Sequence, residues 1–456
     1  MTTINIGLYL SLVLFVATLV LGIRALKERE IPRILILIVT LLLILSPPLT
    51  TRFLPQTAWT REAFVPCAGV AAVGNDVIAI GSGWHPLYVL RRTQGQWVRE
   101  ATFVREEETS KAVIGDPNDY GYTINDCAAI LASPSSYDSD RSLGVGVAIS
   151  NDTVFFSSWS HQSDQIRNDT TTYTSSYRDG QWSEPEPLPP PGNDSTNIGF
   201  ELDVSGDVLV SGGSGTVHVY RRDPISNRWM FSDTIPNPKC LREDIKLGRS
   251  VAVDDNTIVV GSRLRGAEAH VFVHNKQSDC WRLEGTLSTE GIEPGYSENL
   301  GTTSRFGVDV DIQGDTLAVG AYGLNFPDGI VFIYTRNRRT GSWKLTDTLK
   351  PIGGRPFWNI RRYFFWYGFG ADVSIDGDTI AVSTGAHESN LYSGGAFTFT
   401  SNYRRRWRQQ SRFTLKEAQS KERFGEAVYI SKDTLVIEGV SNGSKGFYIF
   451  KRSEMQ

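Results

Sequence analysis

Three histidines of this 456-residue chain, His85, His161 and His387, come nearest to a catalytic pattern. Each follows the second of two short apolar runs in a repeated unit, and Glu388 stands beside the last histidine. Three converging imidazoles could hold Zn²⁺, which in catalytic sites takes three protein ligands and a water. Because nothing in the spacing requires convergence, we predict no metal site. A metal-assisted hydrolase that uses these histidines and nearby acids is the enzymatic alternative.

The rest of the chain carries no nucleophile elbow, metalloprotease helix motif, phosphate loop or paired-cysteine metal motif. Its formal net charge of −4, from 46 basic and 50 acidic residues, provides no general attraction to nucleic acid. We therefore predict a protein that is not an enzyme, has no cofactor and does not bind nucleic acid.

A dense aromatic and basic segment, RPFWNIRRYFFWYGFG, runs from Arg355 to Gly370. Aromatic rings and guanidinium groups suit stacking on a sugar or peptide and bidentate capture of a carboxylate. The alternative is a loop that folds its own aromatic side chains over the core. The candidate ligand-binding residues of this segment and of the equivalent connections elsewhere are Trp84, His85, Trp159, His161, Tyr322, Arg355, Trp358, Arg361, Arg362, Trp366 and His387.

Seven copies of one β unit must position these residues. In each copy a two-residue turn joins two short apolar runs, and a third run and a fourth run follow. The turns end at Asp76, Asp152, Asp207, Asn256, Asp315, Asp378 and Asp433, and the fourth runs begin near Trp97, Trp182, Trp229, Trp281, Trp343 and Trp407. We expect the repeat tryptophans to pack between neighbouring units.

The fifth copy shows how one unit works. Val308, Val310 and Ile312 alternate with Asp309 and Asp311, the period-two pattern of a strand with one buried face. Gly307 opens this strand, where a side chain would obstruct the close approach of another backbone.

The seventh copy stops at its third strand, FYIFKR, which ends at Arg452. The segment AWTREAFV, residues 58–65, is a near copy of QWVREATFV, the fourth strand at residues 96–104. We therefore predict that strand 58–65 completes the last unit, which leaves no open sheet edge. The predicted fold is all-β, a seven-bladed β-propeller over residues 57–456.

Five copies open with phenylalanine or leucine followed by glycine: Leu143-Gly144, Leu247-Gly248, Phe306-Gly307, Phe369-Gly370 and Phe424-Gly425. With VGAY, VSTGA and VVGS after the second strand, this series resembles the FG-GAP repeat. That repeat is the blade unit of the integrin α-subunit propeller and of many surface proteins. The resemblance covers residues 58–452 and implies protein binding or adhesion outside the cell.

One feature of the integrin repeats is missing from this chain. Integrin-type repeats often carry an acidic calcium loop between the first and second strands, whereas here every such connection is a two-residue turn. Calcium needs six to eight converging oxygen ligands, which such a turn does not provide. The turn aspartates therefore favour turn formation rather than metal binding.

The longest insertions lie in connections that share one face of the predicted propeller, which we call the top face. They are residues 104–142, 158–171 and 351–368. Because binding residues concentrate on connections held by a rigid scaffold, we predict that the top face binds a protein or a glycan. A structural subunit of an envelope complex is a further alternative.

Residues 1–50 differ from the rest in being strongly apolar. Runs at residues 4–23 and 32–48 predict two transmembrane helices, and Arg24, Lys27 and Arg29 between them favour a cytoplasmic loop. A cleaved signal peptide is the alternative for the first run. With a short linker at 51–56, the hairpin would hold the propeller at the membrane on the extracytoplasmic side.

The chain has four cysteines, Cys67, Cys127, Cys240 and Cys280, all outside the apolar runs. An even number suits an oxidising compartment, and four cysteines allow three pairings. A Cys240–Cys280 bridge is plausible and would leave Cys67 with Cys127. Four buried free thiols are the alternative.

Overall fold

The computed structural model describes the blades and their shorter connections. The described residues are 59–66, 69–74, 76–81, 87–105, 112–114, 141–162, 167–190, 198–213, 215–236, 247, 250–261, 268–289, 305–322, 329–352, 368–384, 394–401, 406–414, 424–441 and 444–452. The chain divides into two compact units, Met1–Gln56 and Thr57–Gln456, and all described residues belong to the second. Both predicted membrane helices lie outside the described residues. Within the described ranges, no helix has the length and apolar character needed to cross a bilayer.

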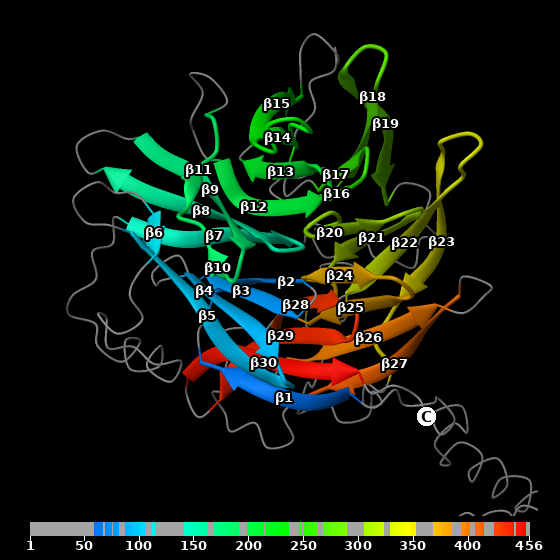
Figure 1. Ribbon diagram of the computed structural model, residues 1–456. Coiled ribbons are helices and arrows are strands. Elements are labelled where there is room, and N and C mark those ends of the chain that lie inside the picture. Colours follow the sequence, from blue (N-terminus) through cyan, green and yellow to red (C-terminus); the bar gives the residue numbers. More distant parts are fainter. Residues whose placement is uncertain are drawn as a thin grey trace, which may run out of the picture. The chain divides into compact units, whose positions relative to one another are not determined.

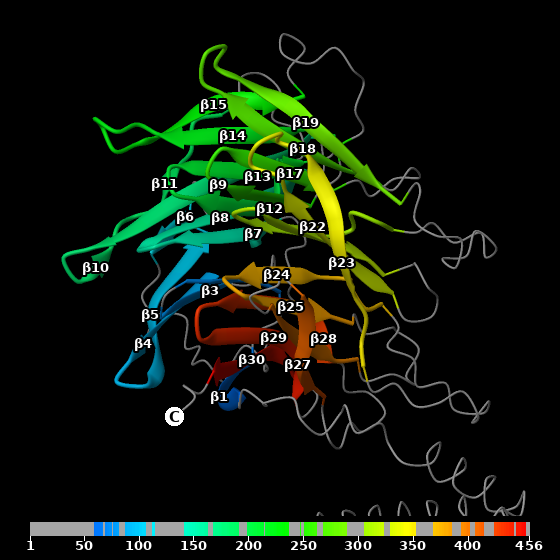
Figure 2. The same cartoon turned by 90° about the vertical axis from the view of Figure 1, so that its right-hand side faces the viewer.

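Seven antiparallel sheets form the blades of a β-propeller (Figures 1 and 2). Blade 1 contains β2 (Val70–Val73), β3 (Val77–Gly81), β4 (Leu87–Thr93), β5 (Gln96–Arg105) and β6 (Ala112–Ile114). Blade 2 contains β7 (Arg141–Ser150), β8 (Thr153–Gln162), β9 (Arg167–Arg178), β10 (Gln181–Trp182) and β11 (Glu186–Pro187). Blade 3 contains β12 (Ile198–Ser205), β13 (Val208–Gly213), β14 (Val217–Arg222) and β15 (Trp229–Ile235).

The remaining blades have four strands each. Blade 4 contains β16 (Val251–Asp254), β17 (Thr257–Gly261), β18 (Glu268–Asn275) and β19 (Cys280–Ser288). Blade 5 contains β20 (Val310–Gln313), β21 (Thr316–Ala321), β22 (Ile330–Arg336) and β23 (Trp343–Leu349). Blade 6 contains β24 (Val373–Asp376), β25 (Thr379–Ser383), β26 (Ala396–Ser401) and β27 (Trp407–Phe413). Blade 7 contains β28 (Phe424–Ser431), β29 (Thr434–Ser441), β30 (Ser444–Arg452) and β1 (Trp59–Val65).

The ring closes through β1, as the sequence predicts. This strand runs antiparallel to β30 from the pair Trp59–Arg452 to the pair Val65–Phe447, with one bulge after Arg61. In Figure 1 the blue β1 lies beside the red β30. The innermost strands then contact one another in the cyclic order β2, β7, β12, β16, β20, β24, β28 and back to β2.

The same tight turn joins the first two strands of blades 2 to 7, which confirms the predicted two-residue hairpins there. The strand residues that flank the turn are paired, as in Gln313 with Thr316 and Ser431 with Thr434. The first turn residue has a left-handed backbone, with φ of 58° at Gly314 and 52° at Lys432. This backbone conformation fits the glycine and asparagine found at several of these positions.

The structure also shows strands where the sequence predicted only insertions. Residues 158–162 extend β8 and residues 167–171 extend β9, and the two extensions pair, with Ser158 opposite Thr171 and His161 opposite Asn168. Within residues 104–142, β6 adds a strand to the outer edge of β5. The fourth strand of blade 2 is split into β10 and β11, which both pair with β9.

The hydrophobic core lies between the blades. Seven apolar clusters fill the seven junctions, and each draws side chains from two neighbouring blades. Repeat tryptophans pack in them edge-on against the preceding blade, with ring centroids 4.9 Å apart for Trp229 and Phe155 and 6.4 Å apart for Trp182 and Phe103. This confirms the predicted packing role for these tryptophans. Phe306 and Phe369, which precede the repeat glycines, are fully buried.

Close backbone approach between blades yields a first test. A Cβ on Gly320 would overlap the carbonyl oxygen of Gly370 in the next blade, whereas a Cβ on Gly285 would meet no atom within 4 Å. We expect Gly320→Ala to lower the free energy of unfolding by about 2 kcal/mol or more and Gly285→Ala to change it by less than about 0.5 kcal/mol. Urea denaturation measures both values. Equal effects of the two substitutions would contradict the close approach.

Candidate functional site

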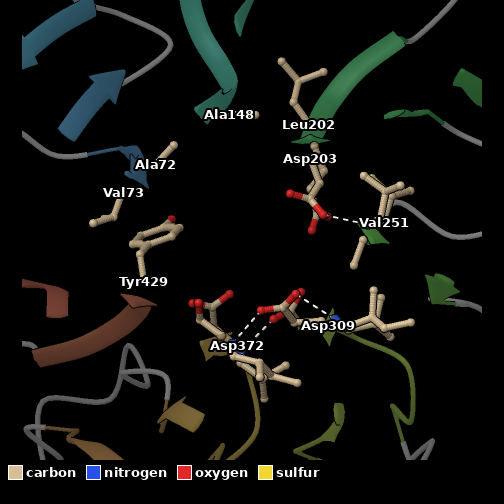
Figure 3. A pocket seen from close by; sticks show the side chains of 18 of the residues that line it. Ala72, Val73, Ala148, Leu202, Asp203, Val251, Asp309, Asp372 and Tyr429 are labelled. Carbon is tan, nitrogen blue, oxygen red and sulfur yellow. Dashed lines mark hydrogen bonds between the residues drawn. The ribbon is translucent and has the colours of Figure 1, made fainter. Parts of the chain in front are cut away.

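The innermost strands surround a central cavity of about 580 Å³ (Figure 3). Its wall carries six acidic residues: Glu201, Asp203, Asp254, Asp309, Asp311 and Asp372. No lysine, arginine or histidine is among the described residues that line it. The cavity therefore brings carboxyl groups together without a neighbouring cationic side chain from the described part of the chain.

The cavity carboxyls join adjacent blades. An oxygen of Asp309 accepts the backbone N–H of Val373 in the next blade at 2.6 Å. In the same way Asp203 accepts the N–H of Val253 at 2.7 Å. Each such carboxyl satisfies an N–H on an innermost strand that has no strand neighbour on its channel side.

Asp309 and Asp372 lie side by side and hydrogen-bond to each other through their side chains (Figure 3). Ser250 Oγ also donates to Asp309 at 2.9 Å. Burial, followed by the charge of Asp309, raises the pKa of Asp372 well above its usual range. Two adjacent carboxyls cannot both ionise without strong repulsion, so this pair holds a proton.

Burial also raises the pKa values of Asp203, Glu201 and Asp311. The pKa of Asp203 rises to about 6, against the lowering effect of the N–H groups of Val253 and Val204. The pKa values of Glu201 and Asp311 rise well above their usual ranges for the same reason, with nearby carboxylates adding to the effect. The site therefore takes up protons readily as the pH falls.

The opposite wall of the cavity is mostly apolar. Figure 3 shows Ala72 and Val73 of blade 1 across from Asp203 and Asp309, and Ala148 of blade 2 between blade 1 and Leu202. Tyr429 of blade 7 lies between the two walls, and burial followed by the charge of Asp372 raises the pKa of its hydroxyl well above 10. The cavity is thus acidic along blades 3 to 6 and apolar along blades 1 and 2.

A further buried acid stands where other blades carry glycine or serine. Glu438 on β29 is 8% exposed and occupies the position of Gly320 in β21 and Ser157 in β8. Burial, followed by the nearby Glu426, raises its pKa to about 7. Its carboxyl also accepts the backbone N–H of Gly69, which joins blade 7 to the start of blade 1.

Of the predicted ligand-binding residues, only Tyr322 has a described side chain. It follows β21, is half-buried, and has the guanidinium carbon of Arg305 at 4.6 Å from its ring centroid. Trp159 and His161 lie on β8, and their side chains fall outside the description. The predicted residues outside the described ranges are Trp84, His85, Arg355, Trp358, Arg361, Arg362, Trp366 and His387, and their roles stay predictions.

The next two features are the possible metal ligands and the cysteines of the described residues. Within the described ranges, no group of three or more histidine, cysteine, aspartate or glutamate side chains is placed to hold a metal ion. Cys280, at the start of β19, is not a free thiol. Cys67, Cys127 and Cys240 lie outside the described residues, so the pairing stays a prediction.

The cavity carboxyls were not predicted from the sequence. The alternating pattern of blade 5 indicates a buried face at Val308, Val310 and Ile312 and suggests no role for Asp309 and Asp311 between them. A signal was present, because residues six, four or two positions before the turn aspartate or asparagine are acidic in several consecutive blades. They are Glu201 and Asp203 in blade 3, Asp254 in blade 4, Asp309 and Asp311 in blade 5, and Asp372 and Asp376 in blade 6.

Comparison with known proteins does not place the chain in a family. No family model matches it, and no curated protein does so either. Among solved structures it is similar to the computationally designed Ika8 protein, at 12% identity and a TM-score of 0.43, over 86% of this chain and 97% of that one. It is also similar to a functionally unknown protein from Desulfotomaculum acetoxidans DSM 771, at 13% identity and a TM-score of 0.42, over 74% and 82%. Likeness at this level carries no conclusion about function.

The raised pKa values predict a propeller that is more stable in mild acid. Because the folded-state pKa values of Asp203 and Glu438 are raised to about 6 and about 7, their protons stabilise the fold at low pH. This contribution is complete below the unfolded pKa values near 4 and is lost as the pH rises through 6 to 7. Urea denaturation should give a larger free energy of unfolding at pH 5 than at pH 8.

Asp372→Asn should reduce this difference. The amide oxygen can still accept from Val428, and the amide N–H₂ can donate to Asp309 at any pH. We expect a gain of about 1 kcal/mol at pH 8 and little change at pH 5. Asp207→Asn, at an exposed turn, is the matched control and should leave the pH profile unchanged. A parallel profile for both variants would show that the Asp309–Asp372 pair holds no extra proton.

Proposed function

We propose that this protein is a membrane-anchored binding module whose propeller engages a protein or a glycan outside the cytoplasm. The observation that supports this most directly is the distribution of connections between the described strands. One face carries the two-residue turns, such as Gln313 to Thr316. The top face carries the long connections, among them the one from Leu349 to Val373. The connections between the first two strands are therefore short on one face, whereas the connections on the top face include long segments.

The connection from Leu349 to Val373 contains the aromatic and arginine-rich segment, and both of its ends are held by blade 6. At one end, the N–H of Ile352 donates to Gln409 Oε1 at 2.6 Å, and Gln409 Nε2 donates back to the Ile352 carbonyl at 3.3 Å. At the other end, Phe369 is fully buried against Phe397 and Phe399. A segment tied at both ends to a rigid blade suits ligand recognition.

The resemblance to FG-GAP surface proteins supports the same function, because such propellers act in binding and adhesion. Trp358, Arg361 and Trp366 are the proposed contact residues, since indole rings and guanidinium groups serve as anchors in protein and sugar recognition.

Alanine substitution of all three contact residues tests the binding function. We expect Trp358→Ala, Arg361→Ala and Trp366→Ala together to reduce binding to a glycan array or to a co-purifying partner at least 10-fold. The thermal midpoint should stay nearly unchanged. The matched control replaces Ile225, Arg228 and Arg338 by alanine on turns of the opposite face, where Ile225 is 94% exposed. Equal loss of binding in the control, or a large loss of stability in the test variant, would contradict the proposal.

Anchoring through residues 4–23 and 32–48 is the second part of the proposal. Chain topology is compatible with it, because β1 begins at Trp59 opposite Arg452, on the face of the two-residue turns. The chain therefore enters the ring on the side opposite the long connections. A short linker before β1 would leave the top face directed away from the bilayer.

Membrane fractionation tests the anchor. The full chain should stay in the membrane pellet after alkaline carbonate extraction, because two apolar helices resist removal of peripheral contacts. Deletion of residues 1–50 should move the propeller to the soluble fraction. Recovery of the full chain in the supernatant would refute the anchor while leaving the binding proposal open to its own test.

A further inference from the structure

Three junctions between blades contain a half-buried glutamate that accepts hydrogen bonds from the next blade or from its own. At the junction of blades 1 and 2, Glu100 accepts the indole N–H of Trp182 at 2.9 Å. Arg91 Nε donates to the same carboxylate at 2.8 Å. The arginine also stacks on Tyr177 of blade 2, at 4.2 Å from its ring centroid.

The junctions of blades 7 and 1 and of blades 4 and 5 have a similar arrangement, except that the arginine comes from the following blade. In each, a glutamate three residues after the tryptophan of its outer strand accepts the indole N–H of the following blade and one arginine N–H. The sets are Glu62 with Trp97 and Arg92 at 3.1 and 2.6 Å, and Glu284 with Trp343 and Arg336 at 3.0 and 2.6 Å. The carboxylate is therefore a recurrent component of the blade junction.

The junction of blades 3 and 4 has the donors without the carboxylate. Ser232, an exposed residue of β15, takes the position of the glutamate, three residues after Trp229. The indole Nε1 of Trp281 is buried and has no hydrogen-bond partner among the residues that the structure describes. Nε and Nη2 of Arg221 are also buried without such a partner. The Arg221 guanidinium carbon lies 5.6 Å from the Trp281 ring centroid, so these donors gather at one place.

The acids nearby do not satisfy these donors. Asp279 Oδ1 lies 3.0 Å from His274 Nε2. Asp233 accepts the N–H of Thr234 at 2.8 Å. Burial, followed by the charge of Arg221, lowers the pKa of His274, so the imidazole is neutral near pH 7 and Arg221 is the cation of the site. Buried N–H groups without acceptors are costly, and a ligand oxygen that reached them would recover that cost.

We propose that the junction of blades 3 and 4 binds a carboxylate group in the position that glutamate occupies in the other junctions. One carboxylate oxygen accepts the indole N–H of Trp281 and the other accepts from Arg221, as the two oxygens of Glu284 do with Trp343 and Arg336. The three equivalent glutamate side chains are 18 to 20% exposed, and Ser232, which takes the same position in this junction, is exposed to solvent. The carboxylate belongs either to a small organic acid or to an acidic side chain of a partner. The site is independent of the proposed top-face function.

Propionate, which ends in the same CH₂–COO⁻ group as a glutamate side chain, is the probe. Thermal unfolding of the full chain in 50 mM sodium propionate should give a midpoint roughly 2 °C above that in sodium chloride of equal concentration. Ser232→Glu should raise the midpoint in chloride by a similar amount and abolish the response to propionate. Ser232→Gln, which adds the length without the charge, is the matched control and should give a smaller increase.

A second measurement keeps the test decisive if Ser232→Glu fails to fold. The indole N–H resonance of Trp281, identified by its loss in Trp281→Phe, should move as propionate is added to the wild-type chain. Arg221→Leu should weaken that response at least 10-fold. An indole resonance that does not move, with no difference between propionate and chloride in unfolding, would overturn the proposal.

A blocked Gly-Glu-Gly peptide distinguishes the two sources of the carboxylate. Equal apparent affinities for the peptide and propionate indicate a small organic acid. An affinity at least 10-fold higher for the peptide indicates an acidic side chain of a partner protein, and the blocked Gly-Gln-Gly peptide should not bind in either case.

Discussion

The inner edge of each blade is the constraint on which the rest of this propeller depends. An innermost strand has a neighbouring strand on one side only, so the N–H groups on its channel side need other acceptors. In blades 3 to 6, side-chain oxygens of one blade accept N–H groups of the next at regular intervals, as Asp309 does for Val373 and Asp311 for Ile375. Further pairs of this kind are Asp203–Val253, Ser250–Val310, Asp254–Gly314, Asp372–Val428, Ser374–Ile430 and Asp376–Lys432. Hydrogen bonds therefore join the blades in addition to apolar packing.

Because these hydrogen bonds are made by carboxyls, several carboxyls lie close together in the cavity, and their mutual repulsion favours protonation. Burial and neighbouring charge raise the pKa of Asp372, and a shared proton relieves the contact with Asp309. The outer junctions use carboxylates differently, since Glu62, Glu100 and Glu284 each meet an arginine. Charge is thus compensated by protons at the centre and by guanidinium groups at the periphery. The junction of blades 3 and 4 differs, because Ser232 replaces the glutamate and the guanidinium group of Arg221 has no carboxylate partner there among the described residues.

The architecture could be predicted from the sequence because it depends on patterns that local physics makes explicit. Turn residues, apolar alternation and the similarity of residues 58–65 to 96–104 were enough to predict the ring and its closing strand. The cavity carboxyls could not be found in this way, because alternation identifies a buried face and does not reveal which backbone N–H of another blade a carboxyl meets. The absence of a glutamate at position 232 can be recognised only from the structure, because the hydrogen bonds of Glu100 show what a glutamate at this position does. The extensions of β8 over residues 158–162 and of β9 over residues 167–171 were missed because the segments SWSHQ and RNDTT show no alternation of apolar residues.

The closing strand also determines when this protein can finish folding. Trp59 pairs with Arg452, so the first strand of the propeller to leave the ribosome waits for the last one to be synthesised. Throughout translation β1 has no partner, and blade 1 lacks the neighbour that covers Ala71, Ile78 and Ile80. Contacts this distant in sequence form late and slowly. A chain that stops before β30 can build successive blades but cannot bury this surface, which marks an incomplete product for chaperones or proteases.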